Sequence, residues 1–344
     1  MQFPEYLICA DKQKTIGNER RDFSVQTILN AANGQKAAAR RKRTREIIKK
    51  LKRNWQLYLI IAVPLAFILV FYYAPMYGVQ IAFKNFIATK GIWGSEWVGL
   101  KYFKQFLGSY HFPRLMKNTL GISIYALIAG FPIPILLAIS INECSNRFIR
   151  KTVQFVSYMP HFISVVVMTS VVLMVLSPRT GFINQLIMML GGETVDFMAK
   201  PEYFKSIYVW SGVWQGMGYN SIIYFAALSG IDPALHEAAI VDGATKLKRI
   251  WHIDLPGISP TIIILLILNS GKIMNVGFEK VLLMQNSVNM SASDIIATYV
   301  YRVGLVEAQY SLSAAVGLFN NIINVILLLS VNWIAGKVSE TSLF

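Results

Sequence analysis

Charged residues are scarce in this sequence of 344 residues, where they make up 15%, against 54% hydrophobic residues. A soluble domain carries nearer a quarter charged residues. The apolar residues are also gathered into long runs. The composition therefore excludes an ordinary soluble protein and predicts an all-α, polytopic membrane protein.

Cysteine and histidine are scarce as well. The two cysteines, Cys9 and Cys144, show no pairing pattern and no metal-ligand spacing. The four histidines fall in different segments, and no two of them stand at ligand spacing. The sequence therefore predicts no metal site.

Motifs for catalysis and nucleotide binding are lacking too. A phosphate-binding P-loop requires G-x-x-x-x-G-K-[ST]. Around Gly271-Lys272, Leu266 stands where the first glycine belongs and Ile273 follows the lysine. No GxSxG, HExxH or protein-kinase motif is present. We therefore expect a non-catalytic chain that binds no cofactor, so that any nucleotide is hydrolysed by another polypeptide.

Acidic residues are outnumbered, with 18 against 33 basic residues and a net charge of +15. Segment 40–53 alone carries nine basic residues and one acidic residue. Clustered basic residues in a membrane protein fix its orientation, so no nucleic-acid partner is expected. The segment is either a topogenic block before the first span or a surface helix that binds anionic lipid. Both interpretations place the N-terminal tail, 1–53, in the cytoplasm.

Six apolar runs are each long enough to cross a bilayer. They lie at about 57–83, 117–141, 155–176, 207–229, 258–282 and 311–334. Pro132 and Pro134 predict a bend in the second run. The first run is too long for a cleavable signal and should stay in the membrane. An even number of spans places both termini on one side, and the basic segments assign that side to the cytoplasm.

Segments 86–115, 178–205 and 283–310 then lie outside. The first holds aromatic residues, and the second holds a possible short helix from Phe182 to Leu190. The aromatic residues form either an outer cap that serves as a docking surface or the usual belt at the membrane interface. They are Trp93, Trp97, Tyr102 and Phe103.

The sharpest motif is the polar segment 237–256 between the fourth and fifth runs, called the elbow here. Its residues predict a helix, a turn at Gly243, a second helix from Lys246 to Trp251, and a stop at Pro256. The pattern is Glu-Ala-Ala, three residues, Gly, nine residues and Ile-x-Leu-Pro. It is formed by Glu237, Ala238, Ala239, Gly243, Ile253, Leu255 and Pro256.

This pattern resembles the EAA motif in membrane subunits of type I, binding-protein-dependent ABC importers, and the resemblance covers roughly 115–335. The segments NWQLYL, YYAPMYGVQIAFKNF and GFEKVLLMQN are similar to the subgroup that imports oligosaccharides, including alginate and pectin fragments. The resemblance implies that the elbow is a pair of cytoplasmic coupling helices seated in a cleft of the ATPase subunit. Glu237 and Asp242 would then pair with arginine or lysine across that interface.

The resemblance further implies a permease in the cytoplasmic (inner) membrane of a bacterium. A second homologous permease, expected to be a paralogue, would pair with it. Two ATPase subunits carrying ATP and Mg, an extracytoplasmic solute-binding protein and an oligosaccharide substrate complete the system. The chain would divide into the tail 1–53, a first helix and outer loop 54–114, a core 115–335 and a cytoplasmic tail 336–344.

The fifth run contains a polar stripe formed by Asn269, Lys272, Asn275 and Glu279, within about 120° of a helical wheel. A charge at mid-span costs at least about 3 kcal/mol unless it faces protein or water. The stripe is therefore either the lining of a translocation path or an internal Lys–Glu pair that holds helices together. An ion-coupled secondary transporter or channel, working through Lys272 and Glu279, is the alternative function.

The fourth run offers a second candidate sugar surface, because aromatic faces stack on pyranose rings and asparagine binds hydroxyls. The alternative is that these aromatics are ordinary packing residues. The candidates are Trp214, Tyr219, Asn220 and Tyr224. Three asparagines of the sixth run, at positions 320, 321 and 324, are expected to face a partner subunit.

Overall fold

The computed structural model describes residues 49–338, so the tail before Lys49 and residues 339–344 lie outside the description. Most of the basic segment 40–53 is among them. The described chain forms two compact units, the first ending at Tyr77 and the second beginning at Gly78. Both units are helical, apart from one short hairpin in the second.

The first unit consists of one apolar helical stretch. It contains α2 (Trp55–Ile68), the π-helix η1 (Leu69–Tyr73) and α3 (Ala74–Met76). Pro64 lies inside α2, and no residue of these three elements is buried within the chain. With the following 3-10 helix η2 (Tyr77–Phe83), they form a 29-residue helix that is long and apolar enough to cross a membrane. This agrees with the run predicted at 57–83.

The second unit begins with a small folded cap. Strands β1 (Lys84–Asn85) and β2 (Glu96–Trp97) pair antiparallel, with Lys84 opposite Trp97. Helices α4 (Gly91–Gly94) and α5 (Lys101–Leu107) complete it. The ring of Phe83 stacks on that of Trp97 at 5.6 Å, and the Tyr102 hydroxyl donates a hydrogen bond to Asn85 Oδ1 at 2.7 Å. Tyr102 and Phe103 thus pack within this cap, whereas Trp93 is 83% exposed.

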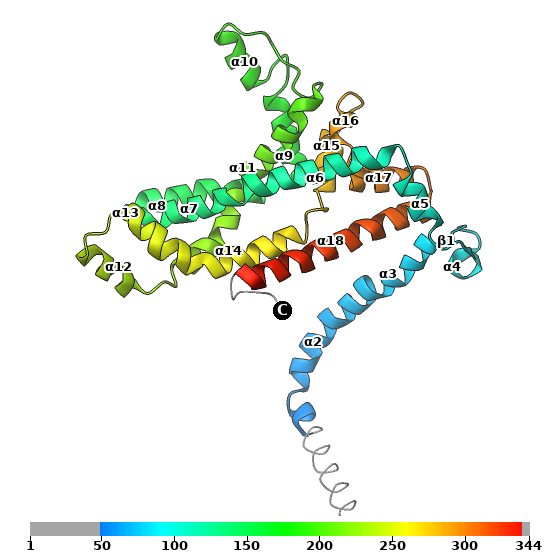
Figure 1. Cartoon of the computed structure of the whole chain (residues 1–344), viewed down its shortest axis with the longest axis horizontal. Coiled ribbons are helices and arrows are strands. Elements are labelled where there is room, and N and C mark those ends of the chain that lie inside the picture. The colour runs from blue at the N-terminus through cyan, green and yellow to red at the C-terminus, as the bar shows by residue number, and fades with distance from the viewer. Residues whose placement is uncertain (1–48, 339–344) are drawn as a thin grey trace, which may run out of the picture. The chain divides into compact units, whose positions relative to one another are not determined.

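Long helices form the body of the second unit (Figure 1). Helices α6 (His111–Gly130) and α7 (Pro132–Glu143) continue one another through Phe131 as one span of 33 residues, and the bend expected at Pro132 and Pro134 stays a prediction. Helix α11 (Pro201–Leu228) packs along both of them. Helix α14 (Leu255–Ser270) packs along α18 (Tyr310–Val338).

The predicted third span, 155–176, is wrong as a single helix. Helix α8 (Arg147–Tyr158) passes into the 3-10 turn η3 (Met159–Phe162), and α9 (Val165–Val175) then leaves at a bend of 103°. Pro160 lacks a backbone donor, and Ile163 adopts an extended conformation. The Ser164 hydroxyl accepts a hydrogen bond from Val167 N at 3.3 Å and starts α9 anew.

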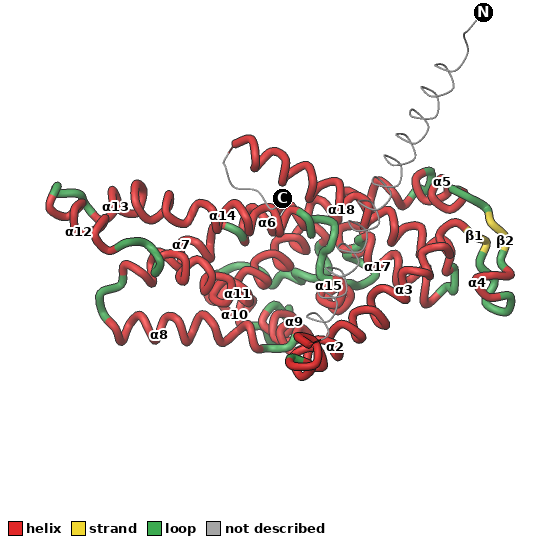
Figure 2. The backbone as a smooth tube through the Cα atoms, turned by 90° about the horizontal axis from the view of Figure 1, so that it is seen from below, coloured by secondary structure: helices red, strands yellow, loops and turns green. Residues whose placement is uncertain are grey.

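The shorter elements lie mainly at the two ends of the second unit. Helices α12 and α13 occupy one end, and the hairpin and α5 occupy the other, as Figure 2 shows from a second direction. The remaining elements are α10 (Phe182–Met189), α12 (Pro233–Val241), α13 (Lys246–Arg249), the π-helix η4 (Ile250–Asp254), α15 (Phe278–Met284), α16 (Met290–Ser293), α17 (Ile296–Tyr301) and the π-helix η5 (Arg302–Val306).

Three buried apolar clusters hold this unit together. One, around Phe106, joins α5, α6, α17 and α18. A second, around Phe204, joins α6, α11 and α15. The third, around Ile258, joins α7, α11 and α14 at the elbow end. Burial of this kind contributes about 25 cal/mol per Å² of apolar surface, so each cluster fixes the helices that carry the site.

Four helices of the described residues can cross a membrane by length and composition, or five if the bent pair α8–α9 is one span. The four are Trp55–Phe83, His111–Glu143, Lys246–Ser270 and Tyr310–Lys337. The predicted fourth run corresponds to the 28-residue α11, which is long enough but more polar. The fifth helix ends at Ser270, well short of the predicted residue 282.

Candidate functional site

The elbow folds as a helix, a tight turn and a second helix. The Asp232 side chain accepts a hydrogen bond from Ala234 N at 2.9 Å and begins α12. At the other end, Gly243 has a φ of +74°, and Ala244 N donates to Ala239 O at 2.8 Å. With the bond from Gly243 N to Ile240 O at 3.0 Å, this is a Schellman C-cap. The predicted turn at Gly243 is confirmed.

The predicted stop at Pro256 is wrong. Helix α13, the π-helix η4 and α14 form one continuous helix of 25 residues from Lys246 to Ser270. In η4, Leu255 N donates to Ile250 O, five residues back, which widens the backbone just before Pro256. A widened turn tolerates a proline that lacks its donor. The elbow is therefore rigidly joined to α14.

The outer face of the elbow carries apolar side chains that nothing in the described chain covers. No residue of α12 or α13 is buried. Val241 is 86% exposed and Leu247 is 78% exposed. The carboxylates of Glu237 and Asp242 are on exposed residues and form no ion pair within residues 49–338. An apolar surface with free carboxylates is the composition of a surface that binds a partner.

A buried acidic residue holds α12 against the long helix. Asp254 in η4 is 1% exposed, and its Oδ1 lies 3.4 Å from Nε2 of His236 in α12. Both carboxylate oxygens lack a hydrogen-bond partner in the described chain. The 3.4 Å contact lacks hydrogen-bond geometry, and it ties the two arms of the elbow together as an ion pair only when His236 is protonated.

A cavity of about 480 Å³ with a mixed polar and apolar wall opens between α6, α7, α11, α14 and the segment 271–277. Apolar side chains form most of its wall. The polar side chains of the wall are Ser123, Tyr208, Gln215, Asn220, Tyr224, Asn269, Lys272, Asn275 and Lys280. Its size and mixed lining fit a ligand of small-molecule dimensions.

The cavity brings together five of the eight residues predicted for a substrate path: Asn220, Tyr224, Asn269, Lys272 and Asn275. The other three do not line it.

Of the three, Trp214 is 44% exposed, and Glu279 is also exposed. The ring of Tyr219 stacks on His161 at 3.8 Å. Within the described residues, Lys272 and Glu279 form no ion pair, so the alternative of an internal pair is not observed.

The helical wheel behind the predicted stripe does not hold beyond Ser270, because residues 271–277 are not helical. Asparagines of α18 hold this segment instead. Asn275 Oδ1 accepts hydrogen bonds from Asn320 Nδ2 at 3.0 Å and from Asn324 Nδ2 at 3.1 Å. Asn324 Oδ1 accepts one from Met274 N at 3.0 Å. Two asparagines expected to face a partner therefore shape the cavity wall.

Four polar residues of the cavity wall were not predicted, namely Ser123, Tyr208, Gln215 and Lys280. The Lys280 side chain is 8% exposed and donates to Tyr208 O at 2.8 Å. The available signal was a second lysine in the fifth apolar run, eight residues after Lys272. It was hidden because a regular helix to residue 282 was assumed.

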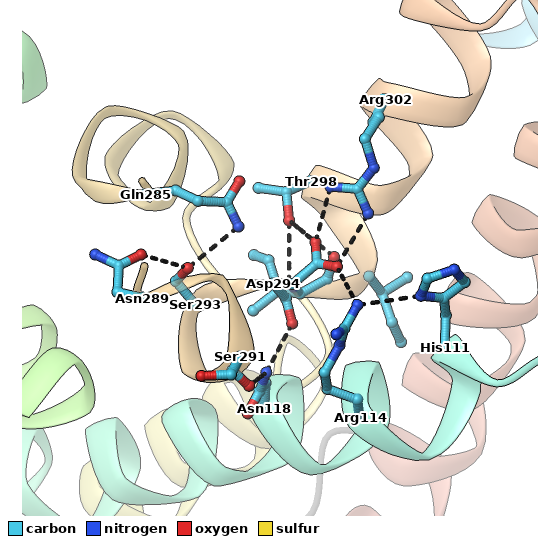
Figure 3. A network of polar contacts seen from close by, with 12 residues as sticks. His111, Arg114, Asn118, Gln285, Asn289, Ser291, Ser293, Asp294, Thr298 and Arg302 are labelled. Carbon is cyan, nitrogen blue, oxygen red and sulfur yellow. Dashed lines mark hydrogen bonds and ion pairs between the residues drawn. The ribbon is translucent and has the colours of Figure 1, made fainter. Parts of the chain in front are cut away.

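A buried carboxylate organises the segment between α15 and α17 (Figure 3). Asp294, which is fully buried, accepts hydrogen bonds from Arg302 at 3.0 Å and from Arg114 at 3.4 Å. Asn118 Nδ2 donates to the backbone oxygens of Ser291 and Asp294. These bonds attach the segment to α6 and fix the end of the unit opposite the elbow.

The comparisons with known proteins decide the family. A family model described as "Binding-protein-dependent transport system inner membrane component" matches residues 130–340. This chain belongs to that family. Protein LplB of Bacillus subtilis (strain 168) is 43% identical over 294 residues, which cover 86% of this chain and 92% of LplB.

A second relative in Bacillus subtilis (strain 168) is the polygalacturonan/rhamnogalacturonan transport system permease protein YteP. It is 41% identical over 303 residues, which cover 88% of this chain and 94% of YteP.

A solved structure, described as a bacterial ABC transporter involved in the import of the acidic polysaccharide alginate, contains a similar chain. The identity is 40% and the TM-score is 0.79, with 86% of this chain and 99% of that chain covered. The same values hold for the alginate transporter in complex with an alginate pentasaccharide-bound periplasmic protein. The present chain is accordingly an ABC importer permease.

Proposed function

We propose that this permease forms, with a second homologous permease, the path by which an oligosaccharide enters a bacterial cell. The observation that supports this most directly is the cavity between α6, α11 and α14. Asparagine and glutamine side chains on its wall offer donors and acceptors to sugar hydroxyls. Relatives named for polygalacturonan/rhamnogalacturonan transport and alginate import support a carbohydrate substrate.

The proposed complex contains two ATPase subunits, which hold ATP and Mg, and a solute-binding protein outside the membrane. The exposed apolar face of α12 and α13 supports the proposal that this face binds an ATPase subunit. The complex of the alginate transporter with its periplasmic protein supports the binding-protein partner. In this proposal the permease itself breaks no bond.

The proposed topology has six spans, with α11 and the bent pair α8–α9 each crossing the membrane. Both termini and the elbow then lie in the cytoplasm, and the cap at β1 and β2 lies outside. Closure of the ATPase dimer would push the elbow, and the continuous helix from Lys246 to Ser270 would carry that movement to the cavity.

Transport by the purified complex tests this function. Vesicles containing the permease pair and the ATPase subunits are expected to take up oligosaccharide only with ATP and loaded binding protein. Lys272→Met is expected to reduce uptake while the complex still assembles. If the chain alone moved solute along a proton or sodium gradient, the secondary-transporter alternative would replace this proposal.

A further inference from the structure

The wall of the cavity carries positive charge without compensation. Lys272 and Lys280 are among its lining residues, and no aspartate or glutamate is. Within residues 49–338, neither ammonium group has a carboxylate oxygen within 4.0 Å. Uncharged polar groups would bind the hydroxyls of a neutral sugar at a lower free-energy cost than lysines do. A buried cation without a counter-charge is unfavourable.

Lys280 is the more buried of the two. Its Nζ donates to Tyr208 O and lies 4.6 Å from the centre of the Tyr208 ring. A Cβ at Gly212, one turn further along α11, would stand 3.2 Å from this Nζ. Because glycine has no side chain at position 212, there is room for the Lys280 ammonium group at the cavity wall. Its remaining N–H donors can bind a ligand.

A third lysine, Lys205, lies near the start of α11 beside α6 and does not line the cavity. The Nζ of Lys205 lies 2.7 Å from the place where a Cβ of Gly121 would be. Gly121 directly precedes Ile122 and Ser123, which line the cavity. No carboxylate among the described residues pairs with Lys205.

These positions follow one face of α11. Residues 205 and 212 are seven apart, which returns to nearly the same face about 10.5 Å along the helix. The Lys205 ammonium group lies beside α6 near the first position, and the Lys280 ammonium group lies beside the second. Lys272 projects from the non-helical segment that closes the cavity. Lys280 and Lys272 thus place two positive charges on the cavity wall, while Lys205 lies outside it beside α6.

We propose that Lys280 and Lys272, both on the cavity wall, form a cationic track that binds the carboxylates of uronic-acid residues in an acidic oligosaccharide. This inference rests on the proposed import function and adds the charge of the substrate and the groups that recognise it. An ammonium group pairs with a carboxylate without the fixed geometry that guanidinium imposes. That property suits a chain that must move past the site.

Equilibrium binding to the whole transporter tests the track. The purified permease pair with its ATPase subunits, in nanodiscs without nucleotide or binding protein, is titrated with fluorescently labelled trigalacturonate. The neutral trisaccharide made by reducing its carboxylates is the matched ligand. The acidic ligand is expected to bind about tenfold more tightly or better, with a preference that falls as salt is added.

Variants assign the preference to the lysines. Lys280→Met and Lys272→Met are each expected to reduce the preference for the acidic ligand several-fold, while Lys280→Arg keeps it. Lys200→Met is the control, because Lys200 precedes α11, lies over the Tyr203 ring and does not line the cavity. It should leave both affinities unchanged.

The outcomes separate the two proposals. Equal affinity of the unaltered complex for both ligands, or no binding of either, overturns the cationic track. An equal loss of affinity for both ligands in the methionine variants also overturns it, because the lysines would then be structural. ATP-driven uptake of either ligand in vesicles would still support the import function, and its absence for both would contradict that function.

Discussion

Replacing Gly243 with alanine should weaken the coupling of ATP hydrolysis to uptake. The size of this loss can be worked out from the backbone conformation of the turn. The φ of +74° lies in the left-handed region, and no atom stands within 4 Å of a Cβ built there. The cost is therefore conformational, about 1–2 kcal/mol for an L-residue. If the elbow binds its partner only in this form, the competent population falls by about 5- to 30-fold.

Two further substitutions of Gly243 should lose coupling to different extents, one less and one more than alanine. Asparagine tolerates the left-handed conformation better than alanine, so Gly243→Asn should lose less. Proline fixes φ near −65° and removes the N–H that donates to Ile240 O at 3.0 Å. Gly243→Pro should therefore insert into the membrane and yet lose more coupling than Gly243→Ala.

The same motif elsewhere in the chain provides the control. Gly191, at the end of α10, has a φ of +82° with nothing within 4 Å of its Cβ position. Gly192 N donates to Ile187 O at 2.9 Å, and Gly191 N donates to Met188 O at 3.0 Å, as in the elbow. Gly191→Ala thus imposes the same strain away from the elbow.

The assay is uptake per ATP hydrolysed by the complete complex in vesicles, with co-purification of the ATPase subunits as a second measurement. Gly243→Ala should lower both, and Gly191→Ala should leave both near the unaltered values. The reasoning fails if the two alanine variants lose coupling equally, or if Gly243→Asn is worse than Gly243→Ala.

Three other substitutions probe the support of the site. Gly218→Ala places a Cβ against the backbone oxygen of Ser157, so it should lower the free energy of unfolding by about 1–3 kcal/mol in a melting experiment on the purified complex. Gly317→Ala is the control and should show no such loss, because its Cβ position is open. Asp294→Asn removes the charge shared by two arginines and should cost about 3 kcal/mol, measured in the same way. Asn184→Ala removes four hydrogen bonds around α10 and should speed its cleavage by protease, while unchanged cleavage would contradict the role of Asn184.

The elbow was the part of the site most accessible from sequence, since its requirements are local. A left-handed turn demands glycine, and the flanking alanines and basic residues favour helix. Both features are confirmed around Gly243. The predicted stop at Pro256 was wrong because the π-turn before it accommodates a residue that has no N–H donor. Such a turn has no sequence signature.

The cavity was less accessible, because its shape depends on contacts between distant segments. Residues 271–277 leave the helix where asparagines of α18, some 50 residues later, satisfy their backbone and side chains. No periodicity within the fifth run contains that information. The prediction nevertheless found Lys272 and Asn275, because a charge or amide in an apolar run needs protein or water around it wherever the helix ends.

The elbow and the cavity are the two ends of one element. The helix from Lys246 to Ser270 has 25 residues, which corresponds to about 38 Å. Its first turns belong to the exposed elbow, and its last residues reach Asn269 on the cavity wall. Since the helix is continuous through Pro256, a displacement at the elbow is not absorbed there. In the proposed complex it would be delivered to the first non-helical segment, 271–277, which carries Lys272. A push from an ATPase subunit would thus arrive at a cationic group of the proposed substrate path.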